Sequence, residues 1–303
     1  MKTILKMPVI LGLCGLASCT NDSEMNRASV PAGDSVKMFA QVPREVLDNM
    51  MQALPQPIEI AKIISSSKVE IGKSLLIPSE NAGTTAERNS QALLLGGYGV
   101  DLGYIDLTGK TIYMIEYLES VKKLAAGLKV DQFFDFGTLS RLAASKEDAD
   151  SLVQLSTDNF NRIDAYLRDA NRGEQSVLIL VGAWLEGTNL FANMYDESGS
   201  ADIAKRIGEQ KVVFDNIYLI VQKFDGSPYF KHLETSLGTL RNSYDKVKIT
   251  YVYKKPVMTE VNGQLVLKDQ TEMHVDYEES ELRNIITEIR KVRSEYFLTT
   301  RSN

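Results

Sequence analysis

The sequence contains little cysteine and little histidine, with two residues of each among 303. Both cysteines, Cys14 and Cys19, stand near the N-terminus, so the rest of the chain offers no disulfide, thiol nucleophile or cysteine-based metal site. His232 and His274 have no histidine or cysteine partner at metal-ligand spacing. No Gly-x-Ser-x-Gly elbow surrounds Ser90. We therefore expect no metal site, no cofactor and no conventional catalytic triad.

An excess of positive charge is also missing, because 34 lysines and arginines face 40 aspartates and glutamates, for a net charge of -6. Proteins that bind nucleic acids favour basic patches with interleaved aromatic residues, so we expect no nucleic-acid partner. Beyond the N-terminal segment we expect no run of residues that could span a bilayer. Hydrophobic residues nevertheless make up 44% of the chain, which is enough to bury a large core.

The N-terminus carries a short apolar segment that ends in Leu16-Ala17-Ser18-Cys19. This pattern is typical of a bacterial lipobox, in which small residues precede the cleavage point and a thiol accepts the lipid. Cys14 fits less well because the bulky Leu13 precedes it. An ordinary secretory signal or a free N-terminal tail would be the alternatives. We predict a signal peptide over residues 1–18, then a lipidated Cys19 with a flexible tether over residues 19–42.

Hydrophobic spacing and chain breakers predict a helical domain over residues 43–248. Thr84-Thr85-Ala86-Glu87 has the pattern of a capping box and predicts a helix start at that point. Short connections between long amphipathic helices favour antiparallel neighbours. The expected helices cover residues 43–54, 58–64, 85–107, 110–128, 138–144, 147–171, 174–195, 201–224 and 228–248.

The pattern changes at Ile249, where β-favouring residues begin to alternate. Asn262-Gly263 separates residues 257–261 from residues 264–267 and predicts a β-hairpin. Residues 272–275 add a short strand, and residues 278–297 return to a helical pattern. We therefore predict a mainly α fold: an antiparallel helical bundle or array, with residues 249–303 forming a small β-hairpin appendage and a closing helix packed on the same domain.

Two segments inside the helical region are similar to each other. Asn89–Tyr98 aligns without gaps with Gln175–Trp184, and each copy has a serine, an apolar run, a glycine, a second small residue and a large aromatic residue. A duplicated helical hairpin would explain this similarity, and so would coincidence between two apolar helices. The spacing differs from the 34-residue period of tetratricopeptide repeats.

Glycines are frequent in these two helices, although each costs about 1 kcal/mol relative to alanine in a helix interior. Close packing between helix backbones would compensate this cost through Gly96, Gly97, Gly99, Gly103, Gly182 and Gly187. The alternative is a pocket in the space that the glycines leave. Its candidate ligand-binding residues are Tyr98, Asp101, Tyr104, Trp184, Glu186 and Asn189.

Asp101 and Glu186 are the acidic pair to consider for acid–base catalysis, since glycosidases use two nearby carboxyl groups. The alternative is a structural role at a helix contact, with Arg141, Arg162 or Arg206 as the salt-bridge partner. We favour the structural role and assign no catalytic residue. The basic run Arg290–Arg293 is interpreted as cations in the last turns of a helix.

Three segments, Leu94–Tyr104, Gly182–Gly187 and Val247–Tyr251, together resemble a family of uncharacterised lipoproteins from Bacteroidetes-type bacteria. The resemblance covers nearly the whole mature chain. That family has no established activity, so the resemblance implies only a Gram-negative envelope and attachment to the outer membrane. We expect a non-enzymatic interaction or ligand-binding module whose partners are the membrane, through the lipid anchor, and an envelope protein or small-molecule ligand. An envelope hydrolase and a purely architectural protein are the alternatives.

Overall fold

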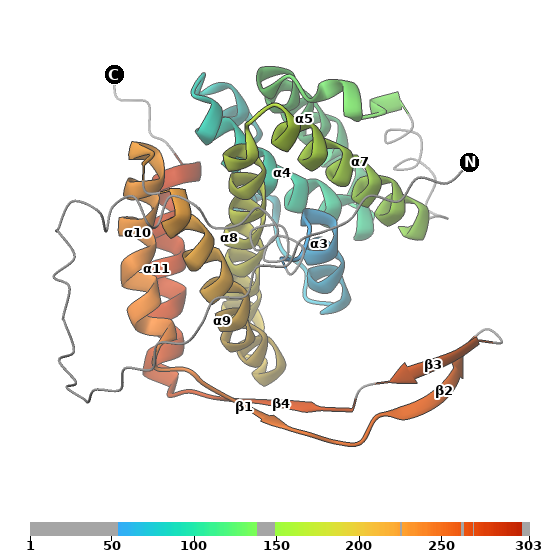
Figure 1. Cartoon of the computed structure of the whole chain (residues 1–303), viewed down its shortest axis with the longest axis vertical. Coiled ribbons are helices and arrows are strands. Elements are labelled where there is room, and N and C mark those ends of the chain that lie inside the picture. The colour runs from blue at the N-terminus through green and yellow to red at the C-terminus, as the bar shows by residue number, and fades with distance from the viewer. Residues whose placement is uncertain (1–53, 138–148, 225, 262–263, 269, 299–303) are drawn as a thin grey trace, which may run out of the picture. The chain divides into compact units, whose positions relative to one another are not determined.

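The computed structural model describes residues 54–137 and 149–298, apart from residues 225, 262, 263 and 269 (Figure 1). The predicted signal peptide, Cys19 and the tether lie outside the described residues. The same holds for Arg141, for the helix expected over residues 138–144 and for nearly all of the helix expected over residues 43–54.

The described part of the chain is mainly helical, as predicted. Its α-helices are α3 (Pro57–Ser66), α4 (Arg88–Leu107), α5 (Met114–Leu128), α7 (Ala149–Asp169), α8 (Gly173–Ser198), α9 (Ala201–Val221), α10 (Pro228–Tyr244) and α11 (Glu279–Phe297). Its short 3-10 helices are η1 (Lys73–Leu75), η2 (Ser79–Gly83), η3 (Thr111–Tyr113), η4 (Asp131–Phe133) and η5 (Gln222–Phe224).

The start of α4 differs from the predicted capping box. Helix α4 begins at Arg88, and Glu87 is its N-cap, with side-chain oxygens that accept hydrogen bonds from the Asn89 and Ser90 amides at 2.9 and 2.6 Å. Thr85 instead accepts a hydrogen bond from the Glu87 amide through its hydroxyl. The carboxylate takes the place of the expected hydroxyl because a negative charge is favourable at a helix N-terminus.

Left-handed residues follow several of the helices, among them α4, α7 and α8. Gly109 and Gly199 have φ angles of 69° and 60° after α4 and α8, a conformation that glycine adopts without strain. After α7, Asn171 rather than the nearby Gly173 takes the left-handed position, with a φ of 56°, and Gly173 begins α8. Asparagine tolerates this conformation better than most residues, so the glycine was not needed there.

Helices α4 and α8 form the centre of the core, and their contacts are reciprocal. A Cβ atom on Gly96 would lie 1.8 Å from the Ile179 carbonyl oxygen, and one on Gly182 would lie 1.9 Å from the Leu93 carbonyl oxygen. The glycine of each segment therefore contacts the residue three positions before the glycine of the other segment. A local two-fold axis relates these two contacts. At Gly96 and Gly182 the missing side chains therefore let the two helix backbones lie in close contact.

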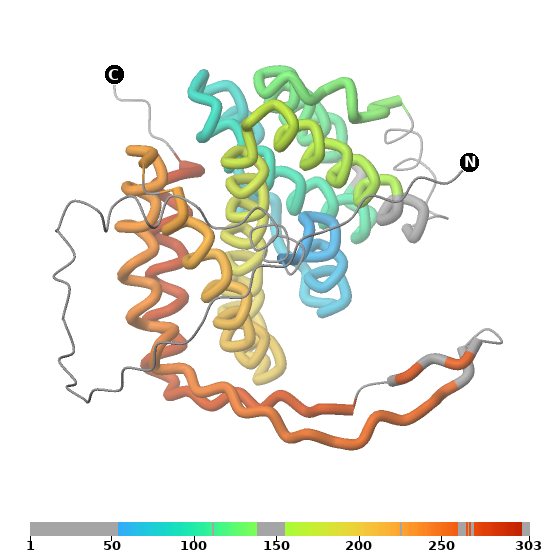
Figure 2. The backbone as a smooth tube through the Cα atoms, viewed as in Figure 1, coloured from blue at the N-terminus to red at the C-terminus, as the bar shows by residue number. Residues whose placement is uncertain are grey.

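The central pair runs parallel. Gln175 on α8 donates a hydrogen bond to Asn89 on α4, 86 residues away, and the glycine contacts farther along both helices keep close to this offset. The expected antiparallel arrangement holds instead for neighbours such as α10 and α11, which lie side by side in Figure 2. Ser236 of α10 donates a hydrogen bond to Glu295 of α11, and Thr239 of α10 donates one to Glu288 of α11. Residue numbers on α11 fall as those on α10 rise, so the two helices are antiparallel.

Equivalent aromatic residues on the central helices contact the helix that follows each of them. The Tyr98 ring meets Tyr117 of α5 edge-on at 6.0 Å, and the Trp184 ring meets Phe214 of α9 at 5.2 Å. The similarity between the two segments thus extends to a second helix in each half. In both halves, the aromatic residue that ends the similar segment thus packs against the next α-helix of the chain.

Helix α8 corrects the expectation that no later segment could span a bilayer. Over Gly173–Ser198 it is long and apolar enough to do so by length and composition alone. The whole apolar window is buried inside the fold, and each residue from Gln175 to Tyr195 is buried. Helix α8 is buried on all sides because α3, α4, α7, α9 and α11 surround it.

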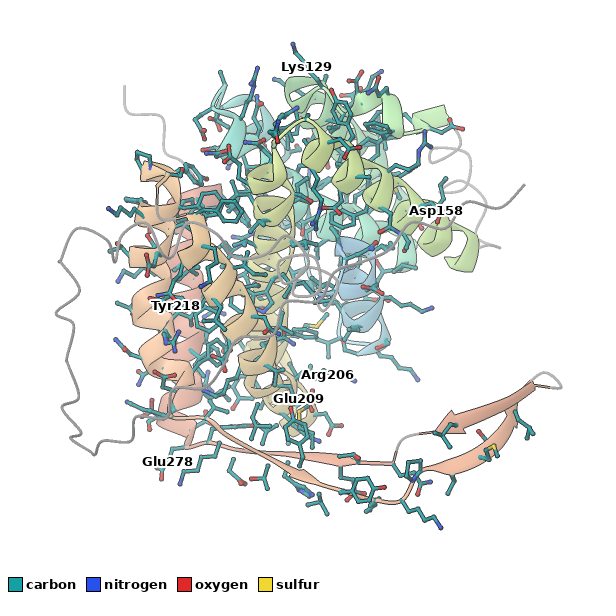
Figure 3. All side chains as sticks on the ribbon, in the orientation of Figure 1. Lys129, Asp158, Arg206, Glu209, Tyr218 and Glu278 are labelled. Carbon is teal, nitrogen blue, oxygen red and sulfur yellow. The ribbon has the colours of Figure 1, made fainter. Side chains whose placement is uncertain are left out.

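The four strands form a two-stranded ribbon between α10 and α11 (Figure 1). Strand β1 (Lys248–Val252) pairs with β4 (Glu272–Asp276), and β2 (Val257–Val261) pairs with β3 (Gln264–Lys268), both antiparallel. Val275 packs on α9 beside Gly208, close to the helix end where Figure 3 labels Arg206 and Glu209. Farther along the ribbon the side chains are exposed: Tyr251, Tyr253, Met258, Leu265 and Leu267.

Candidate functional site

Three candidate ligand-binding residues on α4 bind the backbone of the loop between α3 and α4. Asp101 accepts a hydrogen bond from the Ile77 amide at 2.8 Å. Tyr104 accepts one from the Ile71 amide at 2.8 Å, and Tyr98 donates one to the Pro78 carbonyl at 2.6 Å. All three side chains are fully buried. A buried loop needs partners for its backbone polar groups, and these residues supply them.

Further polar side chains hold the same loop from other helices. Tyr117 and Ser120 of α5 donate hydrogen bonds to the Ile77 and Ser79 carbonyls at 2.8 and 2.9 Å. The ammonium of Lys110 donates to the Ile71 carbonyl. The loop therefore occupies the space in which a pocket around Tyr98, Asp101 and Tyr104 was expected.

Glu186 on α8 forms a buried ion pair with Arg293 on α11. The Arg293 Nε atom lies 2.6 Å from Glu186 Oε2 and its Nη2 atom lies 2.9 Å from Oε1, a two-pronged geometry. Nη2 also donates to the Leu75 carbonyl at 3.2 Å, which joins this pair to the loop. Glu186 is fully buried and Arg293 is 8% exposed.

The partner of Glu186 was not among the arginines expected from the sequence. Arg162 lies over the Phe133 ring, while Arg206 is placed on α9. Arg293, interpreted from the sequence as a cation in the last turns of its helix, instead turns into the core. The arginine lies 107 residues from Glu186, so no local spacing marked the pair.

The environment shifts the ionisation of this cluster. Burial and the negative charge of Glu186 raise the pKa of Asp101 well above its usual range, although the Ile77 amide and Arg293 oppose the shift. For Arg293, burial lowers the pKa, but the charge and hydrogen bonding of Glu186, together with the nearby Asp101 and Tyr117, raise it by more, so the net shift is upward. One carboxyl group thus favours its neutral form beside a charged pair.

The two remaining candidates on α8 are buried and incompletely paired. The indole nitrogen of Trp184 and the side-chain nitrogen of Asn189 have no hydrogen-bond partner within the described part of the chain. Trp184 and Gly187 line a cavity of about 340 Å³ between α3, α8 and α9. Thr188 lines the same cavity and donates to the Trp184 carbonyl through its hydroxyl.

The other glycines receive side chains rather than a backbone. A Cβ atom on Gly97 would approach Ile77 Cδ1 at 2.6 Å, one on Gly103 would approach Ala61 Cβ at 2.8 Å, and one on Gly187 would approach Ile60 Cγ2 at 2.2 Å. A Cβ atom on Gly99 would approach Pro57 at 3.1 Å. These glycines allow the loop and α3 to lie close to the central helices.

A second cavity, of about 110 Å³, lies between α3, α4, α5, α7 and α8, and we call it the α4–α7 cavity. Gly99 and Gly103 contribute to its wall. Its lining is mainly apolar, with Leu95, Leu102, Leu118, Val121, Phe160 and Ile163 among the residues. Polar residues also reach it: Gln56, Asp106, Ser156 and Asn159.

Asn159 on α7 is the most distinctive polar residue of the α4–α7 cavity. The residue is 3% exposed, and its Nδ2 atom is buried without a hydrogen-bond partner in residues 54–137 and 149–298. Burial raises the pKa of the neighbouring Asp106. An apolar space with a few unpaired polar groups is typical of a small-molecule site.

The sequence pointed to Gly99 and Gly103 but not to this cavity. The cavity needs residues from five helices, and its α7 contribution carried no motif. An asparagine inside an amphipathic helix is the one signal that could have been noticed, since it is unusual on a buried face.

Comparison with protein-family models, curated proteins and solved structures finds no match for this chain.

Proposed function

We propose that this chain is a lipid-anchored protein of a Gram-negative envelope and that it binds a small molecule without transforming it. The lipobox pattern supports the anchor. The α4–α7 cavity supports binding, and it is the observation that carries the proposal, because its mainly apolar wall also includes the polar residues Gln56, Asp106, Ser156 and Asn159. An interaction with an envelope protein is compatible with the same anchor.

The anchor is tested by phase partitioning in detergent and by intact mass. The wild-type protein and a Cys14→Ala variant should carry acyl chains and enter the detergent phase. A Cys19→Ala variant should lose the acyl mass and remain in the aqueous phase, because each buried methylene contributes about 0.8 kcal/mol to membrane binding. An unacylated wild-type protein, or an acylated Cys19→Ala variant, would exclude this attachment.

Binding is tested with two compact probes, cyclopentanone and methylenecyclopentane, on protein with labelled isoleucine methyl groups. Ile163 and Ile179 line the α4–α7 cavity, whereas Ile217 is buried on α9. At least one probe should shift the first two signals in a saturable manner and leave the Ile217 signal unchanged. If neither probe does so, the cavity is not a binding site and the proposal fails.

A filling variant makes the same test more specific. Leu118→Trp on α5 places an indole at the cavity wall and should abolish probe binding. Leu219→Trp, which makes the same change at a 43% exposed position on α9, is the matched control and should leave binding intact. Equal binding by both variants would place the probes elsewhere on the protein.

The hydrolase alternative draws no support from Asp101 and Glu186. Glycosidase carboxyl groups must reach the substrate, and both of these are fully buried, one bound to Arg293 and the other to a loop amide.

A further inference from the structure

The hairpin of β2 and β3 has open edges and exposed apolar side chains. The two strands form a sheet of their own, and within the described part of the chain neither has a second neighbour. Met258, Leu265 and Leu267 on this hairpin are 67%, 72% and 68% exposed. A two-stranded hairpin is marginally stable in water, and an open apolar edge is a template for a further strand.

The register shows which residues of β3 face its free edge. Val261 and Gln264 pair across a two-residue connection, and such a flanking pair exchanges both of its hydrogen bonds. Hydrogen-bonded and non-hydrogen-bonded pairs then alternate along an antiparallel ladder. The backbone groups of Val266 therefore point to β2, whereas those of Leu265 and Leu267 point away from it. The free edge of β3 offers the N–H and C=O groups of these two leucines.

Strand β3 lacks the features that keep an edge strand from pairing, whereas β2 has them. Natural edge strands are protected by lysine, by proline and by charges within the strand. Lys255 and Pro256 directly precede β2, and Glu260 lies within it. The sequence of β3 is Gln-Leu-Val-Leu-Lys, with its only charge at the last position. The edge of β3 is therefore the one to which a strand can be added.

The β3 sequence is symmetric around Val266, which has a leucine on each side. A two-fold axis through this position pairs Leu265 of each copy with Leu267 of the other copy, and these are the residues whose backbone groups face outward. Gln264 then stands opposite Lys268, so no like charges meet. On these grounds we infer that two copies of this chain pair through β3, antiparallel, into a four-stranded sheet of order β2-β3-β3-β2.

This self-association depends on neither the lipid anchor nor the proposed ligand binding. Each copy contributes one strand of five residues, Gln264–Lys268, which is a small interface. Stable complexes bury at least about 1,200 Å² in total, so the pairing should be weak and reversible. A covalent trap suits such a dimer, because it retains the pairs that form only briefly.

The trap is a single thiol in the purified full chain, whose two cysteines are replaced by Cys14→Ala and Cys19→Ala. In the paired sheet, position 266 lies opposite itself at a non-hydrogen-bonded pair, where the Cα atoms are about 4.5 Å apart and a disulfide can form. Thr259→Cys, directly across the ladder on β2, is the matched control. After mild oxidation, Val266→Cys should give at least about tenfold more cross-linked dimer than Thr259→Cys.

Two proline variants of the Val266→Cys chain test which edge pairs. Leu265→Pro removes an N–H that faces away from β2, so the hairpin keeps its hydrogen bonds while the free edge of β3 loses a donor. This variant should lower the yield of dimer at least about tenfold. Met258→Pro makes the same change on the outer edge of β2 and should leave the yield unchanged.

A mixed trap checks the register without a change at position 266. Chains with Gln264→Cys and chains with Lys268→Cys should cross-link to each other in an equimolar mixture more than either does to itself. An uncross-linked Val266→Cys chain, as expected if β3 instead binds a lipid surface or another protein, would overturn the inference. Equal yields at positions 259 and 266, or a yield that Leu265→Pro does not reduce, would overturn it as well.

Discussion

Removal of Arg293 should unfold this protein more readily than removal of any ordinary surface arginine. In an Arg293→Met variant, the Glu186 carboxylate loses both hydrogen bonds of 2.6 and 2.9 Å while it remains fully buried. The Leu75 carbonyl loses a donor as well. Breaking a buried pair on one side typically costs about 3–5 kcal/mol, because an uncompensated charge stays in the core.

The expected loss is large enough to measure in two ways. In urea, the free energy of unfolding should fall by about 3–5 kcal/mol with an unchanged slope. In thermal unfolding, the Tm should fall by roughly 6–20 °C, since 1 kcal/mol corresponds to about 2–4 °C for a domain of this size. Raising the salt concentration should change these differences little, because a buried pair is weakly screened.

Arg283 provides the matched control on the same helix. Its side chain is 54% exposed, and it pairs with Glu279 and Asp196 at 2.9 Å each. Because solvent screens such pairs, Arg283→Met should cost less than about 1 kcal/mol. Similar losses for the two arginine variants would refute the reasoning.

A double variant checks that the penalty comes from the unpaired charge. Adding Glu186→Gln to Arg293→Met removes the buried carboxylate and should recover at least half of the lost stability. Coupling of this kind is measured by the double-mutant cycle. Additive losses would show that Arg293 stabilises the fold through packing alone.

Three further predictions follow from packing, ionisation and exposure. Gly96→Ala should lower the free energy of unfolding in urea by at least about 3 kcal/mol, because its Cβ would lie 1.8 Å from a carbonyl oxygen of α8. The control Gly238→Ala, whose Cβ would have its nearest atom at 4.0 Å, should stabilise the protein by about 0.5–1 kcal/mol. Equal effects of the two variants would contradict the close contact. The folded-state pKa of Asp101 is raised, so its contribution to stability is complete at low pH and is lost as the pH rises through that pKa. Asp101→Asn should therefore gain stability relative to the wild type as the pH rises above the usual pKa of an aspartate, and a difference that does not change with pH would exclude this origin. The double variant Leu265→Ser with Leu267→Ser should alter the free energy of unfolding by less than about 0.5 kcal/mol per site, because these side chains are 72% and 68% exposed. It should also reduce self-association measured by light scattering. A large destabilisation would show that the two side chains are covered in solution.

Most of the fold could be predicted because its signals are local. Helical spacing placed the described helices to within a few residues, and Asn262-Gly263 marked the hairpin between β2 and β3. The contact between α4 and α8 was also predictable, because paired glycines in two similar apolar segments leave few other ways to offset their cost. The parallel direction of α4 and α8 could not be predicted from the sequence, because it depends on the path that the chain takes through α5 and α7 between them.

The candidate site was harder to predict because its contacts are long-range. Tyr98, Asp101 and Tyr104 were predicted as candidate ligand-binding residues, but sequence alone does not distinguish a ligand from a loop of the same chain as their partner. Hydrogen bonds to backbone groups carry no sequence requirement on the loop side, so Ile71 and Ile77 gave no signal. Arg293 was missed because its helix pattern alone did not show which cation faces inward.

The parallel pairing of α4 and α8 also has a kinetic consequence. Its first contact joins residues 86 positions apart, so the ordering entropy of the intervening chain must be paid before the two backbones can meet. A chain that stops before Gly173 would leave the Leu93–Gly96 surface open to water, with no local partner of equal fit. The hydrophobic core therefore cannot form until the second half of the chain is present. Truncated chains should be degraded early by proteases.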